Sequence, residues 1–252
     1  MVGRWLKDRK PADIFVSTKG GFYDVDACEK PRLNEADIRG DLEQSLAALE
    51  LDCVDFYWLH RDDESIPASQ IIDYMNALLQ EGKFKKFGAS NWRSERIEQA
   101  NRYAKENDLT GFSASQIRFN PAYCLGERGG LVGMDAKEFA FYQNNSMPVA
   151  AYSSQAKGFF SKMAEFGESG LSEKAKKRYL CEENIRRTEI IKQLAKEHNC
   201  SIASVVCAIL CSVAEFDVFP IIGGRNVMQI LDSLQGADVE ISSEMVKAFM
   251  DF

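Results

Sequence analysis

Residues 55–92, DFYWLHRDDESIPASQIIDYMNALLQEGKFKKFGASNW, form one complete predicted strand-helix-strand unit. Residues 55–59 are short, apolar and aromatic, which is typical of a strand buried on both faces of a parallel sheet. A helix is predicted over about residues 67–80, because proline occupies its first turn, apolar side chains share one face and glycine follows its end. Residues 84–89 form the next predicted strand.

Polar residues follow each of these two strands. His60 comes after the first strand, and Ser90 and Asn91 come after the second. Consecutive strands of a parallel sheet present their carboxyl ends at one edge, where α/β proteins place ligands and chemistry. We therefore expect His60 to lie near Ser90 and Asn91.

The same alternation of strand and helix runs through the whole chain. The predicted strands are residues 14–18, 55–59, 84–89, 111–117, 147–151 and 218–222. The polar residues at their ends are Lys19, His60, Ser90, Asn91, Gln116, Tyr152, Ser153, Gly223 and Arg225. Right-handed crossovers would bring these ends to one face, as in a (β/α) barrel. Such a barrel needs eight strands, and the sequence predicts six.

Length and composition favour a single domain over residues 1–252. With 45% hydrophobic residues the chain can bury a large core. The net charge is -7, from 31 Lys and Arg against 38 Asp and Glu, which makes nucleic acid and anionic membranes poor partners. The longest apolar run, residues 202–213, is shorter than the ~20 residues of a membrane span. The N-terminus lacks the apolar core of a signal peptide.

The seven cysteines indicate a reduced, cytoplasmic protein. They are scattered mostly through apolar segments, without CxxC pairs or the density of a disulfide scaffold. Cys207 and Cys211 lie four residues apart on a predicted helix, but neither of the two histidines is near. We interpret both as buried packing residues and expect no metal site.

Lys19 and His60 are candidate catalytic residues, and each also has a purely structural interpretation. A strand-end lysine can hold an anion or shift the pKa of a neighbour, or it is simply solvated. A histidine there can transfer a proton or donate to a carbonyl oxygen, or it is a hydrogen-bonded core residue. Their placement on adjacent strands favours the functional interpretation.

The other strand-end residues fit a nucleotide with a carboxamide ring at one end and phosphate at the other. Ser90, Asn91 and Gln116 supply hydroxyl and amide groups for a carboxamide, and Tyr152 offers a flat face for an aromatic ring. Residues 223–225, Gly-Gly-Arg, open a helix, so backbone N–H groups and the guanidinium suit phosphate, although an ordinary turn has the same pattern. The sequence has no GxGxxG, so a Rossmann site is not indicated.

In their order and spacing these motifs resemble the aldo-keto reductase superfamily over nearly the whole chain. They are Ser17-Thr18-Lys19, Leu59-His60, Gly82-Lys83, Gly88-Ala89-Ser90-Asn91, Gln116, Ala151-Tyr152-Ser153, and Ile222-Gly223-Gly224-Arg225 with Gln229. The resemblance implies an α/β TIM (β/α)8 barrel, here lacking about the first two strand-helix units. It also implies NADPH-dependent reduction of aldehydes or ketones to alcohols.

The resemblance further implies how the cofactor is held. The cofactor-binding residues would be Ser90, Asn91, Gln116, Tyr152, Ser153, Gly158, Gly223, Arg225 and Gln229. The first three would hold the nicotinamide carboxamide, Tyr152 would stack on its ring, and Ser153 and Gly158 would lie beside the pyrophosphate. Arg225 would meet the adenosine 2′-phosphate and Gln229 the adenine. The family usually has Asn where this chain has Ser233, which leaves NADH open.

The family's catalytic tetrad is Asp, Tyr, Lys and His, with Tyr as general acid. Lys19 and His60 match the last two. The Asp and Tyr would belong to a segment preceding Met1, so weak or absent turnover is expected of the chain as written. Tyr23 and Asp24, in the loop after Lys19, are the residues near enough in sequence to be considered as replacements.

Two other hypotheses remain open. One is a non-catalytic NADP(H)-binding or interaction protein that keeps the cofactor residues without the general acid. The other is a six-strand remnant whose open sheet edges lead to dimers or aggregates. Whether the protein is a monomer or a homo-oligomer is left open.

The carbonyl substrate is not specified by the sequence. Its pocket would be formed by loops, of which residues 22–32 and 155–183 are the visible ones. The second of these exceeds ordinary loop length, so it is expected to be functional or partly helical. Trp92 is a further candidate for the pocket wall, although an aromatic residue after a strand is more often packing.

Overall fold

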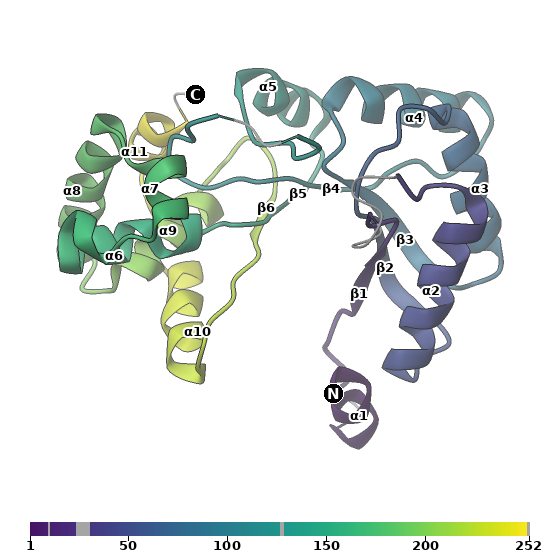
Figure 1. The fold of residues 1–252 in the computed structure, drawn as a ribbon, viewed down its shortest axis with the longest axis horizontal. Coiled ribbons are helices and arrows are strands. Elements are labelled where there is room, and N and C mark those ends of the chain that lie inside the picture. Colours follow the sequence, from purple (N-terminus) through teal and green to yellow (C-terminus); the bar gives the residue numbers. More distant parts are fainter. Residues whose placement is uncertain (10, 24–30, 127–128, 251–252) are drawn as a thin grey trace. The chain divides into compact units, whose positions relative to one another are not determined.

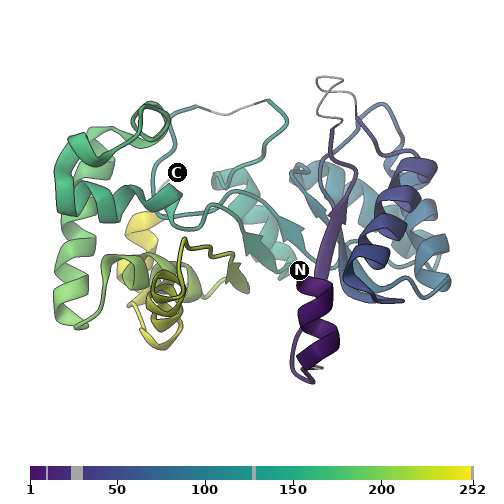
Figure 2. The same ribbon diagram turned by 60° about the horizontal axis from the view of Figure 1, so that its bottom comes forward.

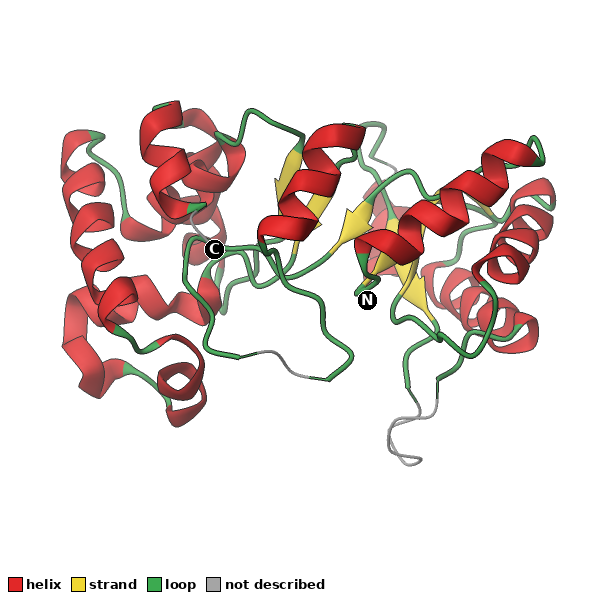
Figure 3. Cartoon of the chain, turned by 90° about the horizontal axis from the view of Figure 1, so that it is seen from above, coloured by secondary structure: helices red, strands yellow, loops and turns green. Residues whose placement is uncertain are grey.

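The computed structural model describes residues 1–9, 11–23, 31–126 and 129–250. It divides into two compact units, Met1–Gln116 and Ile117–Phe252, and each is described by itself. In both units parallel strands alternate with helices (Figure 3).

The first unit contains four parallel strands and four helices among its described residues. The strands are β1 (Ser17–Gly20), β2 (Val54–Leu59), β3 (Phe84–Ser90) and β4 (Ser115–Gln116), and they pair in that order. The helices are α1 (Val2–Arg9), α2 (Glu35–Leu49), α3 (Ala68–Gln80) and α4 (Ser94–Glu106). Figure 1 shows α2, α3 and α4 lying along one side of β1–β3.

The central strand-helix-strand unit forms as predicted. On β2, Tyr57 and Leu59 on one face are fully buried, and Phe56 and Trp58 on the other face are buried as well. Ile71, Ile72 and Met75 on one face of α3 are fully buried too. This burial on both faces of β2 explains why its sequence is a continuous apolar run rather than an alternating one. Spacing alone therefore placed this core correctly.

Two predicted strands of the first unit are shorter in the structure. The stretch 14–18 becomes strand only at Ser17, and Phe15 is 66% exposed. The stretch 111–117 is reduced to β4 at its end. Here Phe112 N donates to Asn101 Oδ1 (2.7 Å) instead of to a neighbouring strand, because a helix side chain supplies the acceptor.

The second unit contains two strands and a group of helices. The strands β5 (Val149–Ala151) and β6 (Val218–Pro220) pair in parallel. The α-helices are α5 (Ala136–Asn145), α6 (Phe159–Phe166), α7 (Glu173–Tyr179), α8 (Glu182–Glu197), α9 (Ile202–Cys211), α10 (Val227–Leu234) and α11 (Ser243–Phe249). The 3-10 turns are η1 (Ala156–Gly158), η2 (Gly167–Gly170) and η3 (Gln235–Asp238). Helices α6, α8 and α9 pack on one another (Figure 2).

The long connection over residues 155–183 is mostly helical. It consists of η1, α6, η2 and α7. Phe159 and Phe160 of α6 are buried, so this segment adds to the hydrophobic core. The prediction that a connection of this length is partly helical is confirmed.

Helices α8 and α9 carry two features that bear on earlier predictions. No single described helix is long and apolar enough to cross a membrane, while α8 and α9, bent by 97° at their junction, pass that test only as a pair, on length and composition. Cys207 is buried, as predicted, but Cys211 is exposed, because it lies at the end of α9. The packing interpretation was wrong for Cys211. The described residues contain no group of three His, Cys, Asp or Glu arranged to hold a metal ion.

Candidate active site

Lys19 and Gln116 meet within the first unit. Lys19 Nζ, in β1, donates a hydrogen bond to Gln116 Oε1 at the end of β4. Burial, and after it the charge of Arg61, lowers the pKa of Lys19 from 10.5 to about 8. Since its partner is a neutral amide, this lysine releases a proton more readily than an exposed one.

His60 lies at the end of β2 and is held mainly through its backbone. His60 N donates to Gly20 O (2.8 Å), and His60 O accepts from Arg61 Nη1 (2.9 Å) and Asn91 Nδ2 (3.3 Å). Burial, followed by the charges of Lys19 and Arg61, lowers the pKa of His60 from 6.5 to about 4. The imidazole is therefore neutral at pH 7, and a neutral imidazole can donate one hydrogen bond to a carbonyl oxygen.

Ser90 and Asn91 join this cluster at the end of β3. Both are buried, and Asn91 Nδ2 lies 3.2 Å from Ser90 Oγ. Asn91 has a φ of 59°, in the left-handed region that asparagine tolerates better than most residues. Its backbone N donates to Gln116 O (3.1 Å). The expected grouping of His60, Ser90 and Asn91 at one sheet edge is thus observed.

Trp92 is a packing residue rather than a pocket wall. It is fully buried, its Nε1 donates to Arg61 O (3.0 Å), and its ring packs edge-on against Phe112 with 4.9 Å between centroids. The hydrogen bond from Trp92 Nε1 to Arg61 O fixes the backbone beside His60. The more ordinary interpretation of Trp92 is confirmed.

Arg61 is an important charge that the sequence interpretation missed. Its guanidinium lies 5.2 Å from the Phe22 ring centroid and 5.8 Å from that of Tyr23, within cation–π range. It lowers the pKa of both Lys19 and His60. Its position directly after His60 was the signal that could have identified it. Asp24 and most of the loop 22–32 lie outside the described residues.

A cavity of about 760 Å³ in the second unit is lined by most of the other predicted site residues. Of those implied by the resemblance, Ser153, Gly158, Gly223, Arg225 and Gln229 line it. They come from the end of β5, from η1, from the end of β6 and from α10, and the first two segments are far in the sequence from the last two. Spatial grouping of these residues was the expectation, and it is observed.

The charges around this cavity are mixed, with cations in excess. Arg225, Lys157 and Lys162 line it, against Glu165 and Asp232. The two lysines were missed by the sequence interpretation, although they flank Gly158 at a spacing of one and four residues. The backbone N of Gly158 is engaged with Gln155 O (2.7 Å), so the side chains of Lys157, Lys162 and Arg225 are the donors that this cavity offers to an anionic group.

Ser233 and Gln229 line the cavity and are also hydrogen-bonded within the protein. Ser233 Oγ donates to Gln229 O (2.9 Å) and accepts from Gln155 Nε2 (2.9 Å). Gln229 Oε1 accepts from Arg225 N (2.8 Å), which fixes the turn before α10. The shorter serine thus ties η1 to α10 where the resemblance predicts an asparagine.

Tyr152 lies next to this cavity in sequence but does not line it. Its backbone N donates to Ile117 O (3.0 Å), and its hydroxyl lies 3.5 Å from Val132 O. It is half-buried and forms a parallel bridge with Arg118. Its proposed stacking on a nicotinamide ring stays a prediction.

A comparison with models of protein families shows to which family the chain belongs. The model of the aldo/keto reductase family matches residues 1–252. The chain belongs to the aldo/keto reductase family. Its fold is therefore of the α/β TIM-barrel type, with six strands among the described residues.

Curated relatives of this family are distant in sequence. Norsolorinic acid reductase A of Aspergillus parasiticus is 26% identical over 99% of this chain and 63% of its own length. The aldo-keto reductase yakc [NADP(+)] of Schizosaccharomyces pombe is 26% identical over 98% of this chain and 72% of its own length. The chain thus spans less than two thirds of the length of the first of these reductases.

A solved structure supports the fold. The thermostable aldo-keto reductase Tm1743, crystallised with the inhibitor epalrestat, superposes with a TM-score of 0.71 at 21% identity, over 99% of this chain and 75% of that one. At this identity the likeness shows the fold alone.

The lowered pKa of His60 leads to a testable pH dependence. Because the folded state disfavours protonation, the unfolded chain binds more protons between pH 6.5 and about 4. We expect the free energy of unfolding to fall as pH falls through this window, and to fall less in His60→Gln. Urea unfolding at several pH values, with the imidazole resonances followed by NMR, measures both. An imidazole of His60 that titrates near 6.5 would contradict the prediction.

Proposed function

We propose that this chain carries the cofactor site of an NADPH-dependent oxidoreductase that reduces the carbonyl group of small aldehydes or ketones in the cytoplasm. The observation that carries the proposal is the cluster at the carboxyl ends of β1–β4, where Lys19 contacts Gln116 and a neutral His60 adjoins Ser90 and Asn91. That it forms one barrel domain over residues 1–252 stays part of the proposal.

The first-unit cluster offers what a nicotinamide carboxamide and a carbonyl oxygen need. Ser90, Asn91 and Gln116 combine hydroxyl and amide groups that both donate and accept hydrogen bonds. The neutral His60 is a donor without a charge, which suits the orientation of a carbonyl. A bound nicotinamide cofactor would supply the hydride, while Lys19 and His60 would act on the proton and the carbonyl oxygen.

The second-unit cavity, taken by itself, offers what phosphate groups need. Its volume is ample for a nucleotide fragment. Lys157, Lys162 and Arg225 supply positive charge, and an added Cβ at Gly223 would meet open space, so the backbone there is accessible. The residues present thus fit a phosphorylated group.

The preference for NADPH over NADH rests on Arg225. An exposed guanidinium at the start of α10 can bind the 2′-phosphate bidentately. Ser233 is occupied by Gln155 and Gln229, so it adds little at the adenine end. The name of the Schizosaccharomyces pombe relative refers to NADP(+), which agrees with this choice for that protein.

The experiment is a titration of the 252-residue chain with NADPH and with NADH, followed by quenching of tryptophan fluorescence. We expect saturable binding of NADPH, weakened roughly tenfold to a hundredfold by Arg225→Ala, because the ion pair with the 2′-phosphate is lost. NADH binding should be unchanged by the same substitution. Arg186→Ala, which removes an exposed arginine paired with Glu183, is the matched control. Equal loss for both cofactors would sink the 2′-phosphate assignment.

A second candidate function is a non-catalytic NADP(H)-binding protein. It is favoured by the grouping of Ser153, Gly158, Gly223 and Arg225 around one cavity, because cofactor binding requires this grouping and catalysis is not needed to explain it. Tight NADPH binding without turnover on any aldehyde, in the form of the protein that the cell makes, would support it. Turnover typical of the family in that form would exclude it.

A further inference from the structure

Arg118 is a buried cation whose guanidinium is not satisfied by the described residues. The residue is 6% exposed, and its Nη1 is buried without a hydrogen-bond partner. An arginine keeps its charge in proteins, and a buried charge is costly unless it is paired. The described part of the second unit therefore leaves a cation in need of an anion.

Further unsatisfied donors lie close by. Within the part of the chain that the structure describes, Arg178 Nη2 is buried without a hydrogen-bond partner, and the Tyr179 hydroxyl, near Asn120, has none of normal hydrogen-bond geometry. Burial, and after it the nearby Cys124, raises the pKa of Tyr179, while Arg178 and Arg118 oppose this. Among the described residues, this region thus has buried donors in excess of acceptors, which favours a ligand that only accepts hydrogen bonds, although Arg178 and Tyr179 do not line the cavity that Arg118 lines.

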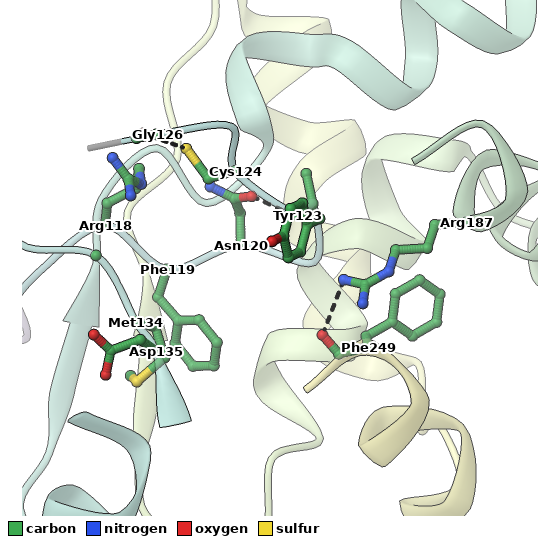
Figure 4. A pocket seen from close by; sticks show the side chains of 12 residues that line it. Arg118, Phe119, Asn120, Tyr123, Cys124, Gly126, Met134, Asp135, Arg187 and Phe249 are labelled. Atoms are coloured by element: carbon green, nitrogen blue, oxygen red, sulfur yellow. Dashed lines mark hydrogen bonds between the residues drawn. The ribbon is translucent and has the colours of Figure 1, made fainter. Parts of the chain in front are cut away.

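Arg118 lines a cavity of about 200 Å³ (Figure 4). In that view Arg118 lies beside Cys124 and Gly126, and Arg187 lies beside Phe249 on the other side. Arg187 is already engaged, with Glu183 Oε1 at 2.6 Å and Phe249 O at 3.2 Å. Arg118 is thus the cation on this wall with donors to spare among the described residues.

The acidic group on the wall does not fill this role. Asp135 Oδ1 accepts from Glu138 N (2.9 Å) and caps α5. The space is sufficient for several waters or for one small polar group, and it is smaller than a site for a drug-sized ligand. A carboxylate group is of the right size.

The backbone around Arg118 holds the guanidinium in place. Arg118 N donates to Val132 O (3.0 Å), and Arg118 O accepts from Met134 N (2.8 Å). A Cβ at Gly133 would lie 2.3 Å from Arg118 Nη2, so the guanidinium lies directly over this glycine. Only glycine at position 133 leaves room for the arginine.

We propose that the Arg118 cavity binds the carboxylate group of a small organic acid. A planar guanidinium matches a carboxylate with two parallel hydrogen bonds. The backbone of Arg118 also forms a parallel β-bridge with that of Tyr152, the residue that the proposed function assigns to the nicotinamide ring. The carboxylate would then belong to the carbonyl substrate itself; that last step rests on the proposed function, whereas the anion site does not.

The test is thermal unfolding and calorimetric titration of the 252-residue chain with benzoate, neutral benzyl alcohol and inorganic phosphate. We expect benzoate to raise the unfolding temperature saturably and benzyl alcohol to leave it unchanged. Arg118→Met should weaken benzoate binding about tenfold to a hundredfold. In anion-free buffer this variant should be at least as stable as the wild type, because an unpaired buried charge is removed.

Two further variants sharpen the result. Gly133→Ala keeps the charge but displaces the guanidinium, and we expect it to weaken benzoate binding as well. Arg186→Gln, at an exposed arginine of the same unit, should bind benzoate as the wild type does. Benzoate binding that survives in Arg118→Met would overturn the proposal. Equal affinity for phosphate would replace a carboxylate site with a site for small anions in general.

A separate experiment tests whether the bound carboxylate belongs to the carbonyl substrate. We expect benzoate to bind the NADPH-loaded chain at least as tightly as the free chain. If benzoate binds through Arg118 but NADPH does not bind, or if the two exclude each other, the anion site stands and its assignment to the substrate fails.

Discussion

Reduction of aldehydes by the 252-residue chain is expected to be roughly 10²–10⁴-fold slower than by a family member with a complete tetrad, even when NADPH is bound. General acid catalysis contributes about this factor, and no residue of the sequence matches the family's tyrosine acid. Lys19 can assist proton transfer and His60 can orient the carbonyl, but neither replaces the tyrosine hydroxyl as the proton donor. Loss of NADPH absorbance with a simple aromatic aldehyde measures the rate.

The comparison enzyme is the Schizosaccharomyces pombe aldo-keto reductase, assayed in parallel. NADPH binding by the same sample separates a missing acid from a misfolded chain, since the first leaves binding intact. Turnover within tenfold of the comparison enzyme would show that another residue donates the proton. Tyr23, beside Arg61, would then be examined first by Tyr23→Phe.

Trp92→Ala should lower the free energy of unfolding by about 3–5 kcal/mol. The indole is fully buried, so its removal leaves a large cavity against Phe112 and Arg96. It also leaves the Arg61 carbonyl without its donor. Urea unfolding followed by circular dichroism measures the change.

Two matched substitutions separate the contributions at this position. Trp92→Phe retains most of the packing and loses the hydrogen bond to Arg61 O, which costs about 1 kcal/mol. Trp5→Ala, at a 45% exposed tryptophan in α1, should stay within about 0.5 kcal/mol of the wild type. A similar, small effect of Trp92→Ala and Trp5→Ala would show that Trp92 is not part of the core.

The candidate site was predictable as far as strand ends are predictable. Parallel strands carry their polar termini to one edge, so His60, Ser90 and Asn91 could be grouped from spacing alone. The hydrogen bond between Lys19 and Gln116 joins residues 97 positions apart, and no local pattern specifies it. Arg61 directly follows His60 in the sequence, which marks its position, but its effect on the pKa of Lys19 and His60 depends on burial and so was missed.

Other features had no local signal. The unsatisfied guanidinium of Arg118 depends on Gly133 and on the wall of its cavity, which come from separate segments. The engagement of Ser233 by Gln155 depends on how η1 meets α10. The short strands β4 and β6 also differ from prediction, because pairing partners rather than apolar runs decide where a strand ends.

The sequence by itself determined the alternation of strand and helix, the apolar core of the central unit and the family motifs, because periodicity and turn residues act over a few neighbouring positions. The tertiary structure alone decided the depressed pKa of Lys19 and His60, the cavity that gathers Gly158 and Arg225, and the buried Arg118 Nη1 that finds no hydrogen-bond partner among the described residues. Burial and electrostatic interactions act through space, so they exist only once distant segments have packed together.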